Sequence, residues 1–420
     1  MKKIKFILIG ALSALALTSC ALFNDNDIVI ENNFKTKEEA SQELPPEATA
    51  GGVGSQSVTI GTTEALLFKN VVYSNLVEDG VKKIKNSYKS GFEYTINEGN
   101  DYVVNPSNNN FDLYVPKGLV KSDNQKIVLF IHGGAWVSGV KSHVNPYVKE
   151  FAKRGYIAAT MEYTLLKESM DDASLSIFRN LDEIDATVTT IKSCLEELEF
   201  DGDKLSLVIG GASSGAHLSM LYAYSRTCPM DIDFVIDAVG PTDIKQAVWK
   251  KFINATDEAL DSELTYSYIS THGSNLEELP VSGRDYGWNA YQTMKIANGM
   301  CGLPYSLETV RAASSDEIHI TNPTNPAYLS MTKANGGEDL LSVTHYINGS
   351  SKPIICAYAG MDSVVGVGQF ANLQFALEDN GVEYEYFYFK TSGHVDLDKT
   401  EEQTTYNEFI EKIVDWLANK

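Results

Sequence analysis

The chain of 420 residues is long enough to bury a large core, and its 43% hydrophobic and 21% charged residues are typical of a soluble globular protein. Its formal net charge of −22 argues against a nucleic-acid partner, because binding a phosphate backbone requires a basic face. After residue 20, no apolar run approaches the length that a membrane-spanning helix needs.

The first twenty residues have the pattern of an export signal. A basic end with three lysines is followed by an apolar stretch from Phe6 to Leu17, and then by Leu17-Thr-Ser-Cys20. This resembles the lipobox of bacterial lipoproteins, which implies that residues 1–19 are removed and that Cys20 carries a lipid anchor. The protein is then expected in the cell envelope, held on a bacterial membrane and facing the periplasm or the exterior. A plain secretory signal with an incidental cysteine is the alternative.

Residues 20–60 are polar, poor in aromatic side chains and interrupted by Pro45-Pro46 and a glycine run. This composition predicts a flexible tether that leads into a folded domain over residues 61–420. Residues 62–90 are ambiguous, and a helix packed on the domain is one interpretation. A polar stretch rich in Tyr and Trp, residues 244–325, interrupts the regular pattern and predicts an insertion between core elements.

The rest of the chain alternates strands with helices. Apolar or alternating runs predict strands at Phe92–Asn97, Phe111–Val115, 126–132, 156–163, 205–209, 234–239, 353–359 and 382–389. Asn145-Pro146 has the pattern of an N-cap and first helical turn, and Gly155 is the expected stop of that helix. Helical spacing of apolar residues predicts further helices that span 178–198, that follow residue 214, that stop at Gly381, and that span 406–417. The first two strands are expected to pair with each other. The alternation predicts an α/β fold with a mainly parallel sheet.

The run from Leu205 to His217, Leu-Ser-Leu-Val-Ile-Gly-Gly-Ala-Ser-Ser-Gly-Ala-His, carries the clearest chemical signal. Within it, Gly211-Ala-Ser213-Ser-Gly215 matches G-x-S-x-G and stands between a buried strand and a helical pattern. In that context the small flanking residues permit a sharp turn that exposes the serine hydroxyl. Ser213 is therefore a candidate nucleophile.

A serine acts as a nucleophile only beside a base that is itself oriented by a further group. Asp362 follows the predicted strand 353–359, and His394 follows the strand 382–389. Both therefore lie at strand ends, where the catalytic groups of such sheets gather. The order Ser213, Asp362, His394 is the order that α/β-hydrolases use.

Rival candidates exist for both partners. Asp396, Asp398 and Asp243 are alternatives to Asp362 as the acid. His217 is close to Ser213 in sequence, but the helix carries it away from the exposed side of the serine, so it is predicted to pack the start of the helix.

The chain over about residues 90–420, apart from the insertion, resembles the α/β-hydrolase superfamily. It is most similar to the esterase branch with an HGG motif, which includes hormone-sensitive-lipase-like carboxylesterases and related feruloyl and acetyl esterases. The resemblance rests on His132-Gly-Gly-Ala-Trp136, the G-x-S-x-G turn, and the aspartate and histidine downstream. It implies Ser213 as nucleophile, His394 as general base and Asp362 as the acid that orients the base.

The resemblance also implies an oxyanion hole made by the backbone N–H groups of Gly134 and Ser214, with Gly133 or Ala135 close by. His132 is expected to be a structural part of this turn. Ser214 stands where the family often has alanine, which matters little because this position contributes its N–H. The insertion falls where many members carry a lid.

The expected function is hydrolysis of small-molecule or polysaccharide-linked carboxylic esters through an acyl-enzyme. Neither a cofactor nor a metal is expected, since no cysteine pair has metal-ligand spacing. No disulfide is predicted, and the oligomeric state is left open. A peptidase or amidase, including a kynurenine-formamidase-like activity, is the alternative within enzymes. A non-catalytic surface-binding lipoprotein is the alternative outside them.

Overall fold

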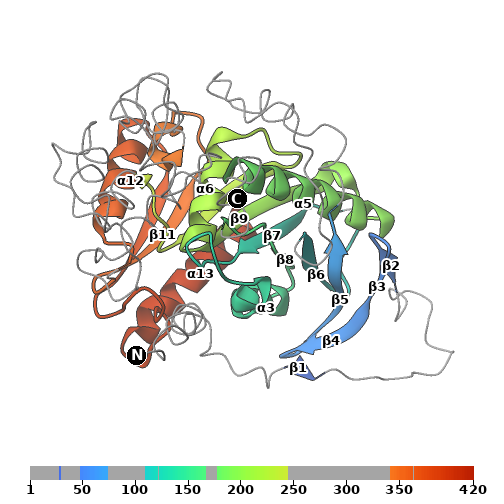
Figure 1. Ribbon diagram of the computed structural model, residues 1–420. Coiled ribbons are helices and arrows are strands. Elements are labelled where there is room, and N and C mark those ends of the chain that lie inside the picture. The colour runs from blue at the N-terminus through green and yellow to red at the C-terminus, as the bar shows by residue number, and fades with distance from the viewer. Residues whose placement is uncertain are drawn as a thin grey trace, which may run out of the picture.

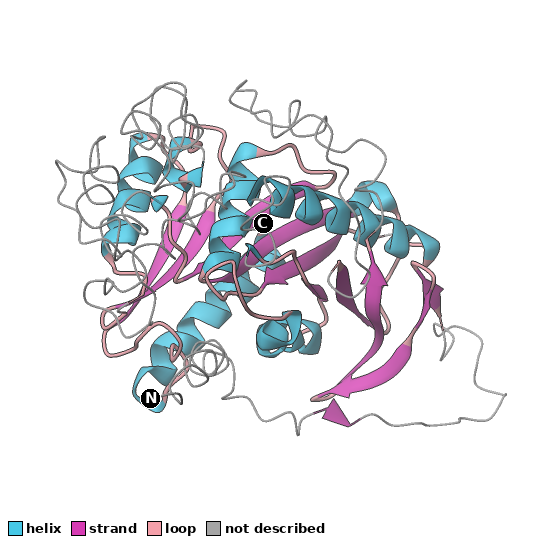
Figure 2. Cartoon of the chain, viewed as in Figure 1, coloured by secondary structure: helices cyan, strands magenta, loops and turns pink. Residues whose placement is uncertain are grey.

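Ten strands form one continuous sheet in the part of the chain that the structure describes (Figures 1 and 2). The computed structural model describes residues 28–29, 48–73, 109–121, 123–166, 177–244, 341–362 and 364–420. In spatial order the strands are β1 (Ile28–Val29), β4 (Gln56–Ile60), β5 (Thr63–Val72), β6 (Asn110–Pro116), β8 (Ile157–Met161), β7 (Gln125–Ile131), β9 (Leu205–Ala212), β10 (Asp231–Ala238), β11 (Ile354–Ala359) and β12 (Tyr384–Phe389). A separate antiparallel pair joins β2 (Thr49–Ala50) and β3 (Val53–Gly54).

The sheet changes character at β8. The strands from β1 to β6 are antiparallel to their neighbours, and so is the β6–β8 pair. From β8 through β7 and β9 to β12, every neighbouring pair is parallel. Antiparallel strands at one side, followed by parallel strands joined through helices, make the α/β-hydrolase fold, and the predicted fold class is confirmed.

Helices cover both faces of the sheet, and the side chains of the central strands alternate between them. Ile127 and Leu129 of β7 pack in the cluster that also holds residues of α5, α6 and α12, whereas Val128 and Phe130 pack with residues of α3 and α13. The helices are α3 (Asn145–Lys153), α5 (Ile177–Glu197), α6 (Ser214–Ser225), α12 (Gly368–Asp379) and α13 (Gln403–Asn419). Figure 1 shows α5, α6 and α12 on one side of the strands and α3 on the other.

The helix ends follow the sequence signals with one correction. Gly155 and Gly381 have φ of 89° and 66°, values that favour glycine, and they follow α3 and α12 as expected. Asn145, however, is not the cap of α3. A 3₁₀ turn, η2 (Lys141–Val144), runs directly into the helix, so Val144 occupies the cap position.

The amino-terminal part of the chain differs from the prediction of a tether over 20–60 and a helix within 62–90. Residues 48–60 belong to the folded domain, because β4 joins the main sheet and its Val58 and Ile60 are buried. The stretch that follows is the ten-residue strand β5, which pairs with β6. Phe111–Val115 is thus a strand as predicted, but its antiparallel neighbours are β5 and β8.

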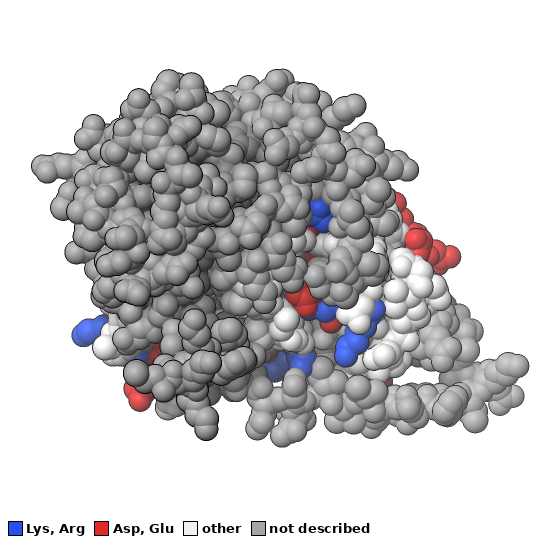
Figure 3. All heavy atoms as spheres, viewed as in Figure 1, with Lys and Arg blue, Asp and Glu red and all other residues white. Residues whose placement is uncertain are grey.

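Some expectations concern residues outside the described ranges. They are the lipid anchor at Cys20, the part of the suggested helix after residue 73, the strand Phe92–Asn97 and the insertion beyond Ile244. Among the described residues, no helix is both long and apolar enough to cross a membrane. Acidic and basic side chains both appear on the face drawn in Figure 3.

Candidate active site

Ser213 lies in the sharp turn that joins β9 to α6. Its backbone has φ 54° and ψ −122°, a strained conformation for any residue other than glycine. The glycines around it permit the turn, since a Cβ at Gly211 would lie 2.5 Å from the carbonyl carbon of Gly215 and 2.6 Å from the carbonyl oxygen of Ile131. The turn predicted from G-x-S-x-G is therefore present, with Ser213 at its centre.

His394 lies between Ser213 and Asp362. Its Nδ1 is 2.7 Å from Oδ2 of Asp362, and its Nε2 is 2.8 Å from Oγ of Ser213. A carboxylate only accepts hydrogen bonds, so Nδ1 carries the proton and Nε2 accepts from the serine hydroxyl. The three side chains follow β9, β11 and β12, whose carboxyl ends share one edge of the parallel sheet. The structure thus brings the three predicted residues into one hydrogen-bonded row.

Backbone N–H groups hold the carboxylate of Asp362 in place. Its Oδ1 accepts from the N–H of Val364 at 2.6 Å and from that of Val365 at 2.8 Å, which leaves Oδ2 for His394. The side chain of Asp362 is fully buried, whereas 13% of the His394 side chain is exposed. The acid therefore has a single fixed orientation, and the base is open toward the reacting side.

The rival acids have other partners. Oδ1 of Asp396 accepts the N–H of Gly393 at 2.5 Å, and Oδ2 of Asp243 accepts from Asn372 at 3.2 Å. Burial raises the pKa of Asp398, with a further contribution from the nearby carboxylate of Asp396. The geometry at His394 favours Asp362.

The predicted oxyanion turn follows β7 and contains two strained residues. Ala135 and Trp136 have φ of 52° and 62°, in the left-handed region that few residues other than glycine adopt. The carbonyl of Gly134 accepts the N–H groups of Val137 at 3.1 Å and Ser138 at 3.0 Å, which closes the turn.

The backbone of this turn lies against the serine. A Cβ on Gly133 would lie 2.7 Å from the carbonyl oxygen of Ala212 and 3.0 Å from Cβ of Ser213. Ser214 is the first residue of α6, where an N–H has no acceptor within the helix and the helix dipole favours negative charge. The predicted oxyanion groups, the N–H groups of Gly133, Gly134 and Ser214, therefore belong to two backbone segments that meet at Ser213.

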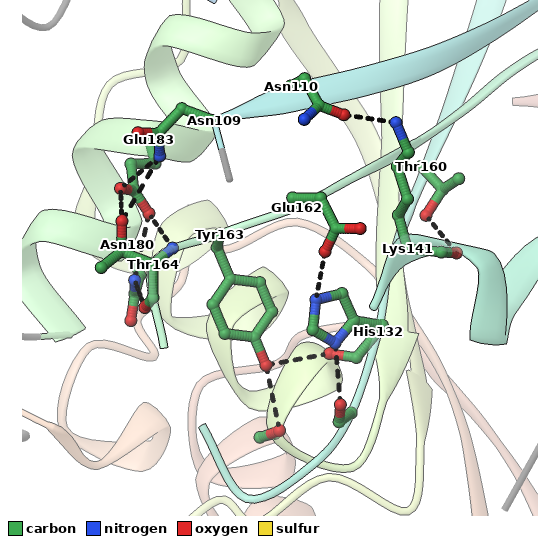
Figure 4. A network of polar contacts seen from close by, with 12 residues as sticks. Asn109, Asn110, His132, Lys141, Thr160, Glu162, Tyr163, Thr164, Asn180 and Glu183 are labelled. Carbon is green, nitrogen blue, oxygen red and sulfur yellow. Dashed lines mark hydrogen bonds and ion pairs between the residues drawn. The ribbon is translucent and has the colours of Figure 1, made fainter. Parts of the chain in front are cut away.

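Tyr163 contacts residues of both turns, and Figure 4 shows its ring beside that of His132. Its ring stacks on His132 with centroids 4.3 Å apart, and its hydroxyl donates to the carbonyl of His132 at 3.2 Å and lies 3.5 Å from Oγ of Ser214. His132 is fully buried, and its Nδ1 bonds to the carbonyl of Gly133 at 2.8 Å, so its predicted structural role fits. The role of Tyr163 was not predicted, although its place at the end of a strand at the same sheet edge was a usable signal.

A buried carboxylate fixes the segment that carries Tyr163 (Figure 4). Glu183 of α5 accepts the N–H of Thr164 at 2.9 Å, the hydroxyl of Thr164 at 2.5 Å and Nε of Arg179 at 2.9 Å. Asn109 and Asn180 donate to the same carboxylate at 3.0 and 3.2 Å. Glu183 thus ties α5 to Thr164, the residue after Tyr163, while Arg179, Asn109 and Asn180 hold the carboxylate in place, so the network positions the support of the site.

His217 is fully buried on α6, away from the triad as predicted. Its Nε2 is 2.7 Å from the carbonyl oxygen of Leu341, and its Nδ1 is 3.2 Å from Nε1 of Trp136. Burial lowers the pKa of His217 to about 4, against a smaller opposite effect of the bond to Leu341. The ring is therefore neutral at physiological pH and unsuited to act as a base.

The described residues contain no group of three or more His, Cys, Asp or Glu side chains that could hold a metal ion. Three cysteines of that part of the chain, Cys194, Cys228 and Cys356, form no disulfide bond within it. Burial raises the pKa of Cys356 in β11, as expected for a thiol inside the sheet.

The chain is similar to known proteins over different lengths. The family model described as BD-FAE matches residues 111–272, a range that includes the HGG turn and Ser213 but ends before Asp362 and His394. A probable isoprenylcysteine alpha-carbonyl methylesterase of Oryza sativa subsp. japonica is 28% identical over 116 residues, which are 26% of this chain. The chain thus matches only about a quarter, 24%, of the length of that curated relative.

Solved structures of esterases are similar to the chain at low sequence identity. Esterase B from Lactobacillus rhamnosis is 15% identical with a TM-score of 0.46, over 76% of this chain and 84% of that chain. A thermophilic esterase from Thermogutta terrifontis with bound butyrate is 14% identical with a TM-score of 0.47, over 74% of this chain and 89% of that chain.

Proposed function

We propose that this protein is a serine hydrolase that cleaves carboxylic esters through an acyl-enzyme. The observation that carries the proposal is the hydrogen-bonded row Asp362–His394–Ser213 at the ends of three sheet strands. The strained turn at Ser213 and the N–H groups beside it supply the other parts that acyl transfer needs. The methylesterase similarity supports an ester rather than an amide as the substrate.

In the first half of the reaction, Oγ of Ser213 attacks the ester carbonyl while Nε2 of His394 takes the hydroxyl proton. The carbonyl oxygen becomes negatively charged and is stabilised by the N–H groups of Gly133, Gly134 and Ser214. Asp362 stabilises the imidazolium through the bond to Nδ1. His394 then gives its proton to the departing alcohol, which leaves the acyl group on Ser213.

In the second half, water attacks the acyl-enzyme and His394 again takes the proton. Collapse of the second tetrahedral intermediate releases the carboxylic acid, and the proton returns to Oγ of Ser213. The residues end in the state in which they began, so no cofactor is consumed.

A fluorophosphonate probe tests the class of enzyme. We expect stoichiometric labelling of the wild-type protein, with the adduct on the peptide that contains Ser213, and no labelling of Ser213→Ala. Unlabelled wild-type protein, or an adduct on another serine, would contradict the proposal and favour a non-catalytic surface-binding lipoprotein.

A substrate panel tests the choice of ester over amide and the branch of the superfamily. It contains aryl esters of short and long acids, acetylated and feruloylated sugars, formylkynurenine and aminoacyl amides. The HGG turn supports the hormone-sensitive-lipase-like branch. For that branch we expect faster turnover of the esters, whether small molecules or groups linked to a polysaccharide, than of the amides. A higher kcat/KM for the amides would replace the ester proposal with an amidase or peptidase.

We also propose that Cys20 carries the lipid that holds the protein in the cell envelope, since Leu17-Thr-Ser-Cys20 follows a basic end and an apolar stretch. Mass spectrometry of detergent-extracted protein is expected to show a diacyl or triacyl group on an amino-terminal Cys20. Cys20→Ala is expected to leave the membrane fraction. Equal fractionation of the two proteins would refute the anchor.

A further inference from the structure

The buried His217 joins three segments that are far apart in the sequence. It belongs to α6, which starts at the Ser213 turn, and it contacts Trp136 in the oxyanion turn and Leu341 on its other side. All three residues are at least nine-tenths buried, with exposed fractions of 0%, 7% and 0% for His217, Trp136 and Leu341. The contact is therefore part of the core beneath the site.

The partners determine which ring nitrogen of His217 carries the proton. The indole Nε1 of Trp136 only donates, and the carbonyl oxygen of Leu341 only accepts. Nδ1 must therefore present its lone pair to Trp136, and Nε2 must donate its hydrogen to Leu341. A second ring proton would point directly at the indole N–H, so this site holds the neutral ring.

Trp136 needs such a contact because its backbone is strained. Left-handed conformations of residues other than glycine cost of order 1–3 kcal/mol each and persist only where the surroundings hold them. The carbonyl of Trp136 accepts the N–H of Leu166 at 2.8 Å, and its ring meets His217 edge to face with centroids 5.3 Å apart. His217 thus fixes the side chain of a residue whose backbone belongs to the oxyanion turn.

The Leu341 side is anchored as well. The N–H of Val343 donates to the carbonyl of Thr242 at 2.8 Å, and the N–H of Ile244 donates to Oγ of Ser342 at 3.1 Å. His217 therefore stands between the turn after β7 and the residues that bond to the turn after β10.

We propose that His217 is a positioning residue that acts through Trp136 to hold the oxyanion turn against Ser213. This inference rests on the proposed function. Because the N–H groups of the turn bond most strongly to the charged transition state, a looser turn lowers kcat and leaves KM nearly unchanged. Loss of one oxyanion donor costs about 10²- to 10³-fold in kcat, and a displaced turn is expected to cost less, about 10- to 100-fold.

The experiment compares four variants with the wild-type enzyme on p-nitrophenyl butyrate. Trp136→Phe removes the indole donor and keeps a smaller aromatic ring, and His217→Leu removes the acceptor. His217→Asn places an amide oxygen near the Nδ1 position and keeps the acceptor. Trp416→Phe, a matched control in α13, removes an indole from the opposite face of the sheet, where its ring meets Phe234.

We expect kcat of Trp136→Phe and His217→Leu to fall by about 10- to 100-fold with KM within about twofold, and the double variant to be no slower than either. His217→Asn should recover most of the loss, and Trp416→Phe should match the wild type. The inhibition constant of a trifluoromethyl ketone, whose serine adduct carries an oxyanion, should rise by the same factor as kcat falls.

Wild-type kcat and inhibition in Trp136→Phe would overturn the positioning role, even if His217→Leu fails to fold. An equal loss in His217→Asn and His217→Leu would also overturn it. Failure of the proposed function is distinct from both outcomes, since the wild-type protein would then hydrolyse the ester no faster than Ser213→Ala.

Discussion

Two histidines, His394 beside Ser213 and His217 in the helix after it, each have a partner at both ring nitrogens. His394 has a carboxylate at Nδ1 and a hydroxyl at Nε2, whereas His217 has an indole N–H at Nδ1 and a backbone carbonyl at Nε2. A second proton on His394 comes from the serine and meets a stabilising negative charge across the ring. A second proton on His217 would face a donor and have no countercharge.

The difference teaches that the partners of a histidine, and not its closeness to a nucleophile, decide whether it acts as a base. His217 is close to Ser213 in the chain, yet its lone pair is occupied by an indole. His394 lies far away in the sequence, yet its lone pair faces the serine hydroxyl. In the proposed mechanism His394 moves protons, whereas His217 positions Trp136.

The largest loss of kcat is expected when Ser213 or His394 is removed. Ser213→Ala and His394→Ala should each lower kcat on the order of 10³-fold or more, and the double variant should be little slower, because the residues act as one unit. Steady-state rates with active-site titration check this. A residual rate should remain, since the backbone oxyanion groups stay in place. Full activity of Ser213→Ala would refute the mechanism.

A smaller loss is expected when only the countercharge of His394 is removed. Asp362→Asn should be about tenfold to a hundredfold less severe than loss of the serine, because the imidazole loses its fixed tautomer while the nucleophile remains. Measurement of kcat/KM checks it, with Asp396→Asn as a control that keeps the oxygen facing the N–H of Gly393. If Asp396→Asn were the slower variant, the acid would have to be reassigned.

The third prediction concerns stability and the His217 side. Burial lowers the pKa of His217 to about 4, and an unfolded histidine titrates near 6.5. Between those values the unfolded chain binds the extra proton and the folded chain does not. Stability from this group is therefore full above about pH 6.5 and is lost as the pH falls toward 4, by about 3 kcal/mol in total.

The matched variant His217→Asn isolates that contribution, because asparagine does not titrate. Urea unfolding of both proteins between pH 4 and 7 should show the wild type losing stability relative to the variant as the pH falls. A constant difference across this range would mean that His217 has the same pKa in the folded protein as in the unfolded chain. The buried Asp237 changes stability in the opposite direction, since burial raises its pKa to about 7, and it cancels in the comparison.

Much of the site could be predicted because each residue carries a local signal. The glycines around Ser213, and the positions of Asp362 and His394 after apolar strands, are all visible in the chain. The contacts that support the site carry no such local signal. Trp136 contacts His217 across 81 positions of sequence, and such a pairing depends on how the strands are ordered.

The amino-terminal strands could not be predicted for a related reason. The ten residues of β5 contain four buried residues in a row, which is compatible with a helix or a strand. Pairing with β6 makes this segment a strand, and β6 begins only at Asn110, well after β5 ends at Val72. The polar composition of residues 48–60 likewise obscured the short alternation of exposed and buried side chains in β4. These side chains become buried only because the strand pairs within the sheet.

The short strand β1 would also limit how far the enzyme stands from a membrane. Ile28 and Val29 pair with Thr59 and Ile60 of β4 at the edge of the main sheet. Ile28 is eight positions after Cys20 in the sequence, and a fully extended chain over eight positions spans at most about 29 Å. A lipid on Cys20 would therefore keep the β1 edge within about 3 nm of the bilayer surface. Such an enzyme would reach ester groups in the thin layer beside its own membrane, whereas an enzyme on a long linker would reach more distant ones.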